Sequence, residues 1–466
     1  MDHRKPWVVG FSMVVSIFLG LALPGTGEAQ SRPADQARRL TLDEALAIAQ
    51  NRNLQLLDSR LAIQEKEYQR REAYSDMFPQ IDVTYVANWN RYRQDGVVHQ
   101  FAASHDSRWT VRGLQLQWWD PDYPYRIDPY RTFSLSVTIT QPIYTGGRLL
   151  NEYKYARLGV DYAELQAEIT RQDLMLNVIE AYYQLVQSEK LLSVADQSIR
   201  ALEALRNQTK EFYKAGVVPK VDVLSTEGQL AQARIQRTQA LTDIQKFTAL
   251  LNFLLRFPQE SRIRVVHDID YRPNSYRIPD IYQTAAANRL EIRQANITVE
   301  QAIALVKSSR ASLVPSISLQ AQGARINDDW NPLDKEAVNS WSLQGVLTWS
   351  FDMFRRRDTM KERVTQQARA FVAQQLLVEQ IMEEVKQAYE DMKRAESDIQ
   401  DNQKAVEFRR ENFRINQERY KEQVATYIEV LDAQRQLAQA EGDYYMALVS
   451  YRINEAVLRR QMGILR

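Results

Sequence analysis

Four short segments of the chain alternate between apolar and polar residues. From Phe133 to Thr140 every odd position is apolar and every even position is a serine or a threonine. Residues 81–90, 317–322 and 341–351 show the same period with at most one lapse each. A period of two predicts β-strands, and apolar–polar alternation over about ten residues suits tilted strands that cross a membrane. Four half-buried strands of a water-soluble sheet would alternate in the same way, so this pattern leaves both alternatives open.

Two stretches are long enough for unusual helices. Residues 148–214 contain one glycine and no proline, and residues 355–423 contain neither. Each would span about 100 Å as a single helix, far more than a helix of three or four turns. Apolar residues in the first stretch follow the spacing of a coiled-coil seam, and they are Tyr162, Leu165, Ile169, Leu176, Ile179, Tyr183 and Val186. A hollow cylinder of coiled helices and a solid coiled-coil rod both satisfy this pattern.

The chain consists of two copies of one unit. Residues 213–217 match residues 420–424, and the matches 221–224 with 428–431 and 229–233 with 436–440 keep the same offset of 207. We therefore predict a first repeat over 30–255, a linker over 256–278 and a second repeat over 279–466. Each repeat should contain a helix of about 35 residues (42–76 in the first), two strands, a very long helix and a final helix.

The N-terminus predicts export. Arg4 and Lys5 precede an uncharged stretch that ends at Gly27, and the small residue Ala29 follows. This order predicts a cleaved signal peptide over residues 1–29, with an uncleaved anchor helix as the alternative. The chain has no cysteine, so we expect neither a disulfide nor an acylated cysteine. Its 60 basic and 59 acidic residues nearly cancel, and this balance argues against nucleic acid as a partner.

Catalytic motifs are missing from the sequence. It contains no H-E-x-x-H, G-x-S-x-G, G-x-G-x-x-G or P-loop pattern, so we expect no enzyme activity and no cofactor. His99 and His105 share one loop without a nearby cluster of ligands, and we expect no metal site there. Four strands are too few to close a barrel, so several copies would have to share one, most simply with cyclic symmetry.

Three segments resemble the TolC-type outer-membrane efflux family. They are residues 40–49 with Asn53, residues 141–148 at a strand-to-helix junction, and residues 420–434. The resemblance covers nearly all of the chain after residue 29, in the right order. It implies a mainly α fold with a β-barrel share: a homotrimeric tunnel with a twelve-stranded barrel in outer-membrane lipid and a helical periplasmic cylinder.

The resemblance also implies a function. Such a channel is a passive export duct that works with a periplasmic adaptor (membrane fusion) protein and an inner-membrane pump of the RND, ABC or MFS type. The alternative is a periplasmic coiled-coil scaffold or adaptor without a pore. Adaptors, however, lack four alternating strands at duplicated positions. The sequence does not name the exported substrate.

The resemblance assigns roles to three groups of residues. The periplasmic tip turns, where the adaptor would dock, contain Gly216, Val217, Pro219, Gln423, Val424 and Thr426. The strand-to-helix junction contains Pro142, Gly146, Gly147 and Arg148. The constriction at the periplasmic gate would contain Glu429, Asp432, Tyr420 and Asp222. Glu429 and Asp432 are three residues apart and share a helix face, so symmetric copies would form rings of carboxylates that favour cations, with an ordinary solvated helix face as the alternative.

The chain departs from the family pattern in four places. Gln423 replaces a usual glycine, so we expect a tighter or differently shaped second tip turn. Leu448 falls near the expected position of the arginine partner of Tyr420, so the closed gate should be held differently. Residues 353–357 replace the second glycine pair. The loop over 91–131 is far longer than the loop over 324–340 and rich in aromatic residues. We expect it to pack on itself as a cap, with a ligand-recognition loop as the alternative.

Overall fold

The computed structural model describes residues 38–94, 126–267, 269–327, 330, 337–350 and 352–465. The predicted signal peptide, His99, His105 and the middle of the long aromatic loop lie outside these residues. The strands on either side of that loop reach Gln94 and begin at Arg126, so the loop is shorter than predicted. Among the described helices, none is both long enough and apolar enough to cross a membrane.

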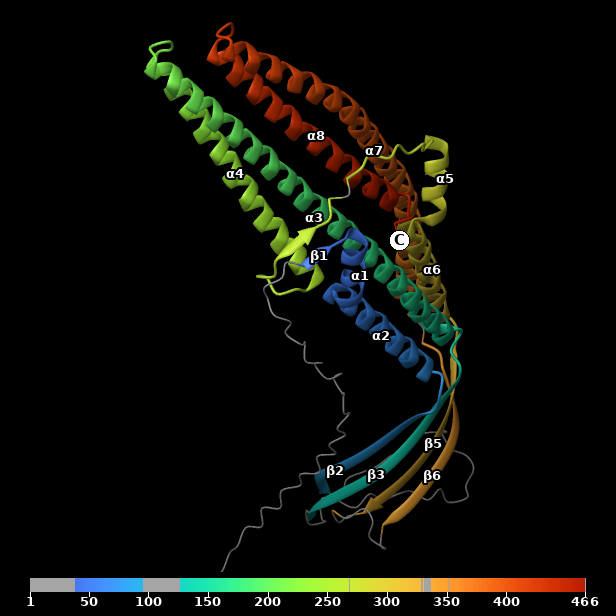
Figure 1. The fold of residues 1–466 in the computed structure, drawn as a ribbon. Coiled ribbons are helices and arrows are strands. Elements are labelled where there is room, and N and C mark those ends of the chain that lie inside the picture. The colour runs from blue at the N-terminus through green and yellow to red at the C-terminus, as the bar shows by residue number, and fades with distance from the viewer. Residues whose placement is uncertain are drawn as a thin grey trace, which may run out of the picture.

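Long helices make up most of the described chain, and the four longest strands gather at one end of it (Figure 1). The helices are α1 (Leu42–Arg52), α2 (Leu54–Ser75), α3 (Arg148–Lys214), α4 (Lys220–Leu255), α5 (Ile278–Asn288), α6 (Leu290–Ala311), α7 (Met353–Lys421) and α8 (Tyr427–Gln461). The strands are β1 (Arg38–Leu40), β2 (Gln80–Gln94), β3 (Arg126–Tyr144), β4 (Ile263–Val265), β5 (Ser316–Asn327) and β6 (Val338–Thr348). Both halves of the chain follow the same order of elements, as the duplication predicts.

The four predicted strands form one antiparallel sheet in the order β2-β3-β5-β6. Strand β3 pairs with β2 from the first half of the chain and with β5 from the second, so the sheet joins the two halves. The register shifts between Pro142 and Tyr144, where β3 leaves the sheet toward α3. β2 and β6 are the edge strands, and each has an unpaired side within the described part of the sheet.

The helices lie side by side in a curved layer that continues from the sheet (Figure 1). Near the sheet, α3 packs between α2 and α6, and α6 packs against α7. Farther away, α3 packs between α4 and α8, and α8 packs against α7. Helices α2 and α4 therefore lie on the β2 side of the layer, and α7 lies on the β6 side along its whole length. Sheet and helices share the same two edges.

The main core lies midway along the helices, where both halves of the chain meet. Leu185 of α3, Leu251 of α4, Ile381 of α7 and Leu458 of α8 are all fully buried there. The short sheet of β1 and β4 lies beside this core and is held by Tyr182. The Tyr182 hydroxyl lies 2.7 Å from the carbonyl oxygen of Val266 and 3.2 Å from its amide nitrogen. Several fully buried side chains, each stabilising by roughly 1.5–3 kcal/mol, fix this central region.

The single helix predicted over residues 42–76 is divided in two, and that prediction was wrong. Asn53 leaves the helical conformation (φ −70°, ψ 136°) and caps α2, because its Oδ1 accepts a hydrogen bond from the Gln55 amide at 2.7 Å. Its Nδ2 donates to the carbonyl oxygen of Leu254 at 3.1 Å, which ties the break to the end of α4. Arg289 occupies the equivalent break between α5 and α6, buried against Glu291 and Glu384.

Candidate functional site: the helical tip

The two tip turns, far from the sheet, have the same backbone shape (Figure 1). Gly216 has φ +74°, and the Val217 amide donates to the Phe212 carbonyl oxygen at 2.9 Å. Gln423 has φ +62°, and the Val424 amide donates to the Arg419 carbonyl oxygen at 2.8 Å. The expectation of a differently shaped second turn was therefore wrong. Gln423 adopts the left-handed conformation although a side chain makes it unfavourable there.

The helices that follow the turns begin differently. Pro219 takes the extended N-cap position of α4 and supplies no side-chain cap. Thr426 caps α8, because its Oγ1 accepts from the Glu429 amide at 3.4 Å. The Thr426 hydroxyl also lies 3.3 Å from the Glu429 carboxylate. The first predicted gate carboxylate therefore takes part in starting its own helix.

Tyr420 lies at the centre of a small apolar cluster that joins the two tips. Its side chain is buried, and its ring meets that of Phe212 edge-on at a centroid distance of 5.6 Å. The Thr209 hydroxyl donates to the Leu205 carbonyl oxygen, so it accepts from the Tyr420 hydroxyl at 3.2 Å. This contact runs from α3 of the first half to α7 of the second.

Asp222 is a buried carboxyl group beside this cluster. Its residue is 7% exposed, and burial raises the pKa of its carboxyl group above the ordinary value. Burial also raises the pKa of Tyr420, and the nearby negative charge of Asp222 raises it further. The structure thus brings Tyr420 and Asp222, two of the four predicted gate residues, into one neighbourhood.

Leu448 does not lie near Tyr420, so it cannot replace a partner of that residue. It is buried in the main core, roughly 30 Å along α8 from the helix start at Tyr427. Sequence reasoning also missed Thr209, the hydrogen-bonding partner of Tyr420. Thr209 is a polar residue within an apolar 3-4-3 row with Leu202, Leu205 and Phe212, and that interruption was the available signal.

Glu429 and Asp432 both lie in the first two turns of α8. Glu429 is exposed, and Asp432 is about half exposed. Asp432 is ion-paired within its own helix, since its Oδ1 accepts from Arg435 at 2.6 Å. Any ring of these carboxylates would therefore carry an arginine beside each Asp432.

The predicted strand-to-helix junction lies at the opposite end of α3. Gly146 (φ +64°) and Gly147 (φ +85°) turn the chain from β3 into α3. A side chain at position 146 would clash, because its Cβ would lie 2.3 Å from Val314 Cγ2 and 2.9 Å from the Ala311 carbonyl oxygen. Arg148 forms an ion pair with Glu152 at 2.9 Å. Backbone shape thus requires glycine at both positions, and the close approach of Val314 and the end of α6 adds a second reason at Gly146 alone.

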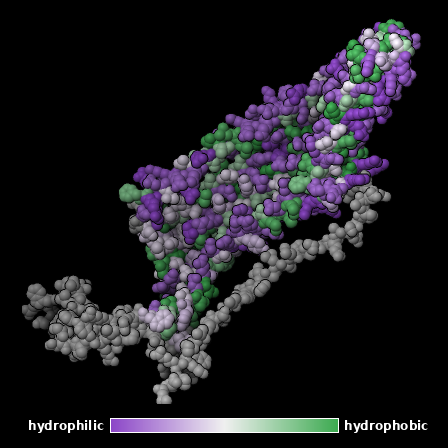
Figure 2. All heavy atoms as spheres, turned by 90° about the vertical axis from the view of Figure 1, so that its left-hand side faces the viewer, coloured by the Kyte–Doolittle hydropathy of each residue, from purple (hydrophilic) through white to green (hydrophobic). Residues whose placement is uncertain are grey.

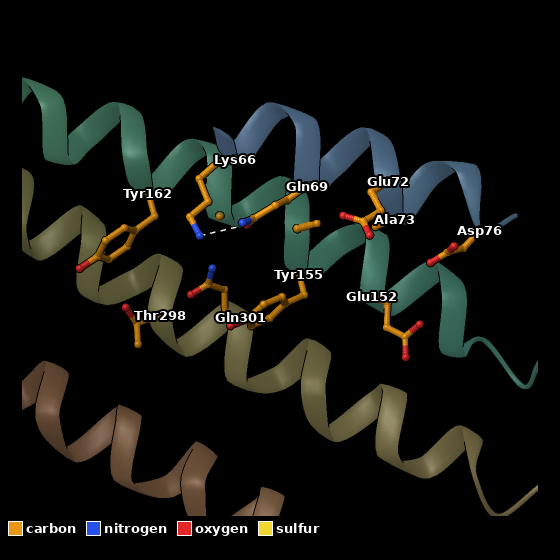
Figure 3. Close-up of a pocket in the computed structure, with 12 residues that line it drawn as sticks. Lys66, Gln69, Glu72, Ala73, Asp76, Glu152, Tyr155, Tyr162, Thr298 and Gln301 are labelled. Atoms are coloured by element: carbon orange, nitrogen blue, oxygen red, sulfur yellow. Dashed lines mark hydrogen bonds between the residues drawn. The ribbon is translucent and has the colours of Figure 1, made fainter. Parts of the chain in front are cut away.

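A polar groove lies between α2, α3 and α6, closer to the sheet than to the tip (Figure 3). It has a volume of about 650 Å³, and the small residues Ala156 and Gly159 of α3 line its floor. Glu72 of α2, Asp76 just after α2 and Glu152 of α3 face it, and Lys66 donates to Gln69 at 3.0 Å (Figure 3). In the described part of the chain, no group of histidine and carboxylate side chains could hold a metal ion.

Comparison with known proteins decides the family. The family model "Outer membrane efflux protein" matches residues 45–255 and 281–464. The chain belongs to that family. Its fold is that of outer-membrane channel proteins. The predictions of the family, of a mainly α fold with a share of antiparallel strands, and of an outer-membrane location with the helices reaching into the periplasm are confirmed.

Individual relatives are distant. Nodulation protein T of Rhizobium leguminosarum bv. viciae is 20% identical over 68% of this chain and 66% of its own length. The probable efflux pump outer membrane protein TtgC of Pseudomonas putida is 22% identical over 62% of this chain and 60% of its own length. The chain thus matches slightly less than two thirds of these relatives. The solved outer-membrane channel OprN superimposes with a TM-score of 0.75 at 18% identity, covering 91% of this chain and 89% of that one.

Proposed function

We propose that this chain is one subunit of an outer-membrane channel that serves as a passive export duct. The supporting observation is the pair of open edges shared by sheet and helices. β2 and β6 each leave backbone N–H and C=O groups unpaired within the described sheet. Such groups are not tolerated in lipid, so neighbouring copies must pair β6 with β2 until the sheet closes. Three copies would supply the twelve strands that the family resemblance implies.

The edge helices carry the apolar surface that such an assembly needs. On α2, Leu54, Leu57, Leu61 and Tyr68 are exposed and lie on one face, away from α3. On α7, the exposed large apolar residues include Val364, Phe371, Val372 and Leu376. One face of the helical part shows apolar groups scattered along its length and gathered at the tip end (Figure 2). A second copy that covers α2 with α7 would bury these side chains.

Substitutions on the α2 edge test the assembly. We expect Leu57→Glu combined with Leu61→Glu to reduce the heat-modifiable oligomer of the protein purified from outer membranes. The control is Lys307→Glu, because Lys307 is an exposed residue of α6, a helix that is flanked on both sides. Full recovery of the double variant as the wild-type oligomer would contradict the proposed edge contact. Loss of the oligomer in the control alone would do the same.

The partners follow from the proposed role. We infer that the tip turns around Gly216 and Gln423 contact a periplasmic adaptor, and that an inner-membrane pump supplies the energy. TtgC is described as a probable efflux pump outer membrane protein, which supports an efflux role here over that of a poreless scaffold. The same channel could instead be the duct of a type I secretion system. The inner-membrane pump with which it assembles decides between efflux and secretion.

We further propose that Tyr420, through its contact with Thr209, holds the closed tip, that Asp222 belongs to the same gate region, and that Glu429 and Asp432 line its opening. In planar bilayers, Glu429→Gln with Asp432→Asn should lower the preference for cations, because two carboxylates per subunit are neutralised. Arg435→Gln is the matched control and should raise the preference, since it frees the Asp432 charge. Unchanged selectivity in both variants would exclude this segment from the constriction.

A further inference from the structure

The second strand-to-helix junction carries charge that the first one lacks. In the first, Gly146 and Gly147 precede Arg148, whose charge is paired with Glu152. In the second, three consecutive arginines, residues 355–357, lie in the first two turns of α7. Arg355 pairs with Asp352 at 3.1 Å. Arg356 and Arg357 form no ion pair with the acidic residues that the structure describes.

These arginines lie where the fold itself disfavours them. The start of a helix carries a partial positive charge from its free amide groups, so cations there are destabilising. The first turn of α7 contains no acidic residue that would offset them. Asp352 offsets the charge of Arg355, but Arg356 and Arg357 are two positive charges without an ion pair at an unfavourable position, which indicates a negative group outside the chain.

The surface next to the arginines is apolar. Trp341, Leu343 and Leu347 point to one face of β6 and are well exposed. Trp349 follows at the end of the strand and is half exposed, and Phe354, one residue before the arginines, is 84% exposed. Pairing of the strand edges between copies leaves the faces of β6 free, so this surface stays available in an oligomer. The order aliphatic, aromatic, cationic is typical of the boundary between a membrane and water.

We propose that this basic junction, formed by Trp349, Phe354, Arg355, Arg356 and Arg357, binds the phosphate groups of anionic phospholipids in the leaflet that faces the helices. The aromatic rings would lie at the level of the headgroups, and the guanidinium groups would bind phosphate oxygens through paired N–H donors. The inference rests on the proposed membrane position of the sheet. β6 has 11 residues and spans about 35 Å, so the phosphates of the opposite leaflet lie out of reach.

The test uses the purified oligomer in detergent, with bound lipids counted by native mass spectrometry. The probes are phosphatidylglycerol and zwitterionic phosphatidylethanolamine. We expect Arg356→Gln with Arg357→Gln to weaken phosphatidylglycerol binding about 25-fold, roughly fivefold per arginine, and to leave phosphatidylethanolamine unchanged. Arg148→Gln at the first junction is the matched control and should change neither, because its charge is already paired with Glu152.

Several results would overturn the inference. They are equal binding of both lipids by the wild type, phosphatidylglycerol binding that the double variant retains, and displacement of phosphatidylglycerol by lipid A. Loss of the oligomer in the double variant, with no lipid preference in the wild type, would assign the arginines to a contact between subunits instead. If the double variant does not fold, the wild type decides alone, since its phosphatidylglycerol preference should disappear at high salt. A conducting oligomer without lipid preference would refute only this inference, whereas a chain that forms no oligomer would refute the proposed function.

Discussion

The two tip turns allow the backbone cost of one side chain to be measured within a single molecule. Gly216 and Gln423 hold the same left-handed conformation, and the residue after each donates an equivalent backbone hydrogen bond, but only Gln423 carries a Cβ atom. Nothing lies within 4 Å of the position that a Cβ at Gly216 would take. Substitution there changes the backbone energetics without a clash, so Gly216→Ala and Gln423→Gly are opposite forms of one experiment.

The expected size follows from two terms. A left-handed conformation costs a non-glycine residue roughly 1–2 kcal/mol. Glycine in turn makes the unfolded chain more flexible, which offsets about 0.4–1 kcal/mol of that difference. The net effect is about 1 kcal/mol, or roughly a fivefold change in the equilibrium between closed and locally opened turn. Gly216→Ala should destabilise the first turn by this amount, and Gln423→Gly should stabilise the second.

Amide hydrogen exchange measures this local opening in the intact oligomer. We expect about fivefold faster exchange at Val217 in Gly216→Ala and correspondingly slower exchange at Val424 in Gln423→Gly. Gly228→Ala is the control, because Gly228 lies within α4 and has no atom within 4 Å of the added Cβ. It should not speed exchange. Faster exchange at Val424 in Gln423→Gly, or unchanged exchange at Val217 in Gly216→Ala, would refute the reasoning.

The remaining predictions concern the junction, the helix break and the buried carboxyl group. Gly146→Ala should lower the thermal midpoint of the oligomer far more than Gly147→Ala, because only position 146 meets Val314 and the backbone of α6; equal shifts would contradict that account. Asn53→Ala should lower the free energy of unfolding in denaturant by about 1–2 kcal/mol, since it removes the cap of α2 and the hydrogen bond to Leu254. An unchanged denaturation midpoint would show that neither contact stabilises the break. The pKa of the Asp222 carboxyl group is raised in the folded tip, because its charged form is disfavoured there. The tip therefore has its full stability below the unfolded pKa of 3.8 and loses stability as the pH rises through the folded pKa. Asp222→Asn should therefore slow amide exchange at the tip at neutral pH and have little effect below pH 3.8, and an equal effect at both pH values would contradict the raised pKa.

Periodicity was enough to predict most elements of the fold. The alternation around residues 133–140 predicted a strand, and the absence of proline between 148 and 214 predicted one helix, which the structure has with those bounds. The break at Asn53 was missed because asparagine is tolerated within helices, and the contact that ties the break to α4 is made with Leu254, two hundred residues away. The ends of the strands were also missed, because the alternation of apolar and polar residues weakens beyond the apolar stripe of each strand.

The site was only partly readable for a related reason. Tyr420 and Asp222 could be proposed from the family resemblance, but their surroundings depend on how the two halves of the chain pack. Leu448 was expected near the position of the arginine partner of Tyr420, because sequence distance does not give a position across helices, and the structure places it in the main core instead. Gln423 was expected to alter its turn, but hydrogen bonds from the flanking residues impose the same shape as at Gly216.

The number of subunits in the complex extracted from outer membranes tests the central claim most directly. Native mass spectrometry of that complex, with single-channel recording of the same preparation, gives both assembly and pore. We predict a closed homotrimer that conducts ions across a planar bilayer, because only neighbouring copies can satisfy the open edges of β2 and β6. A monomer recovered from the soluble periplasm, without conductance, would contradict the account.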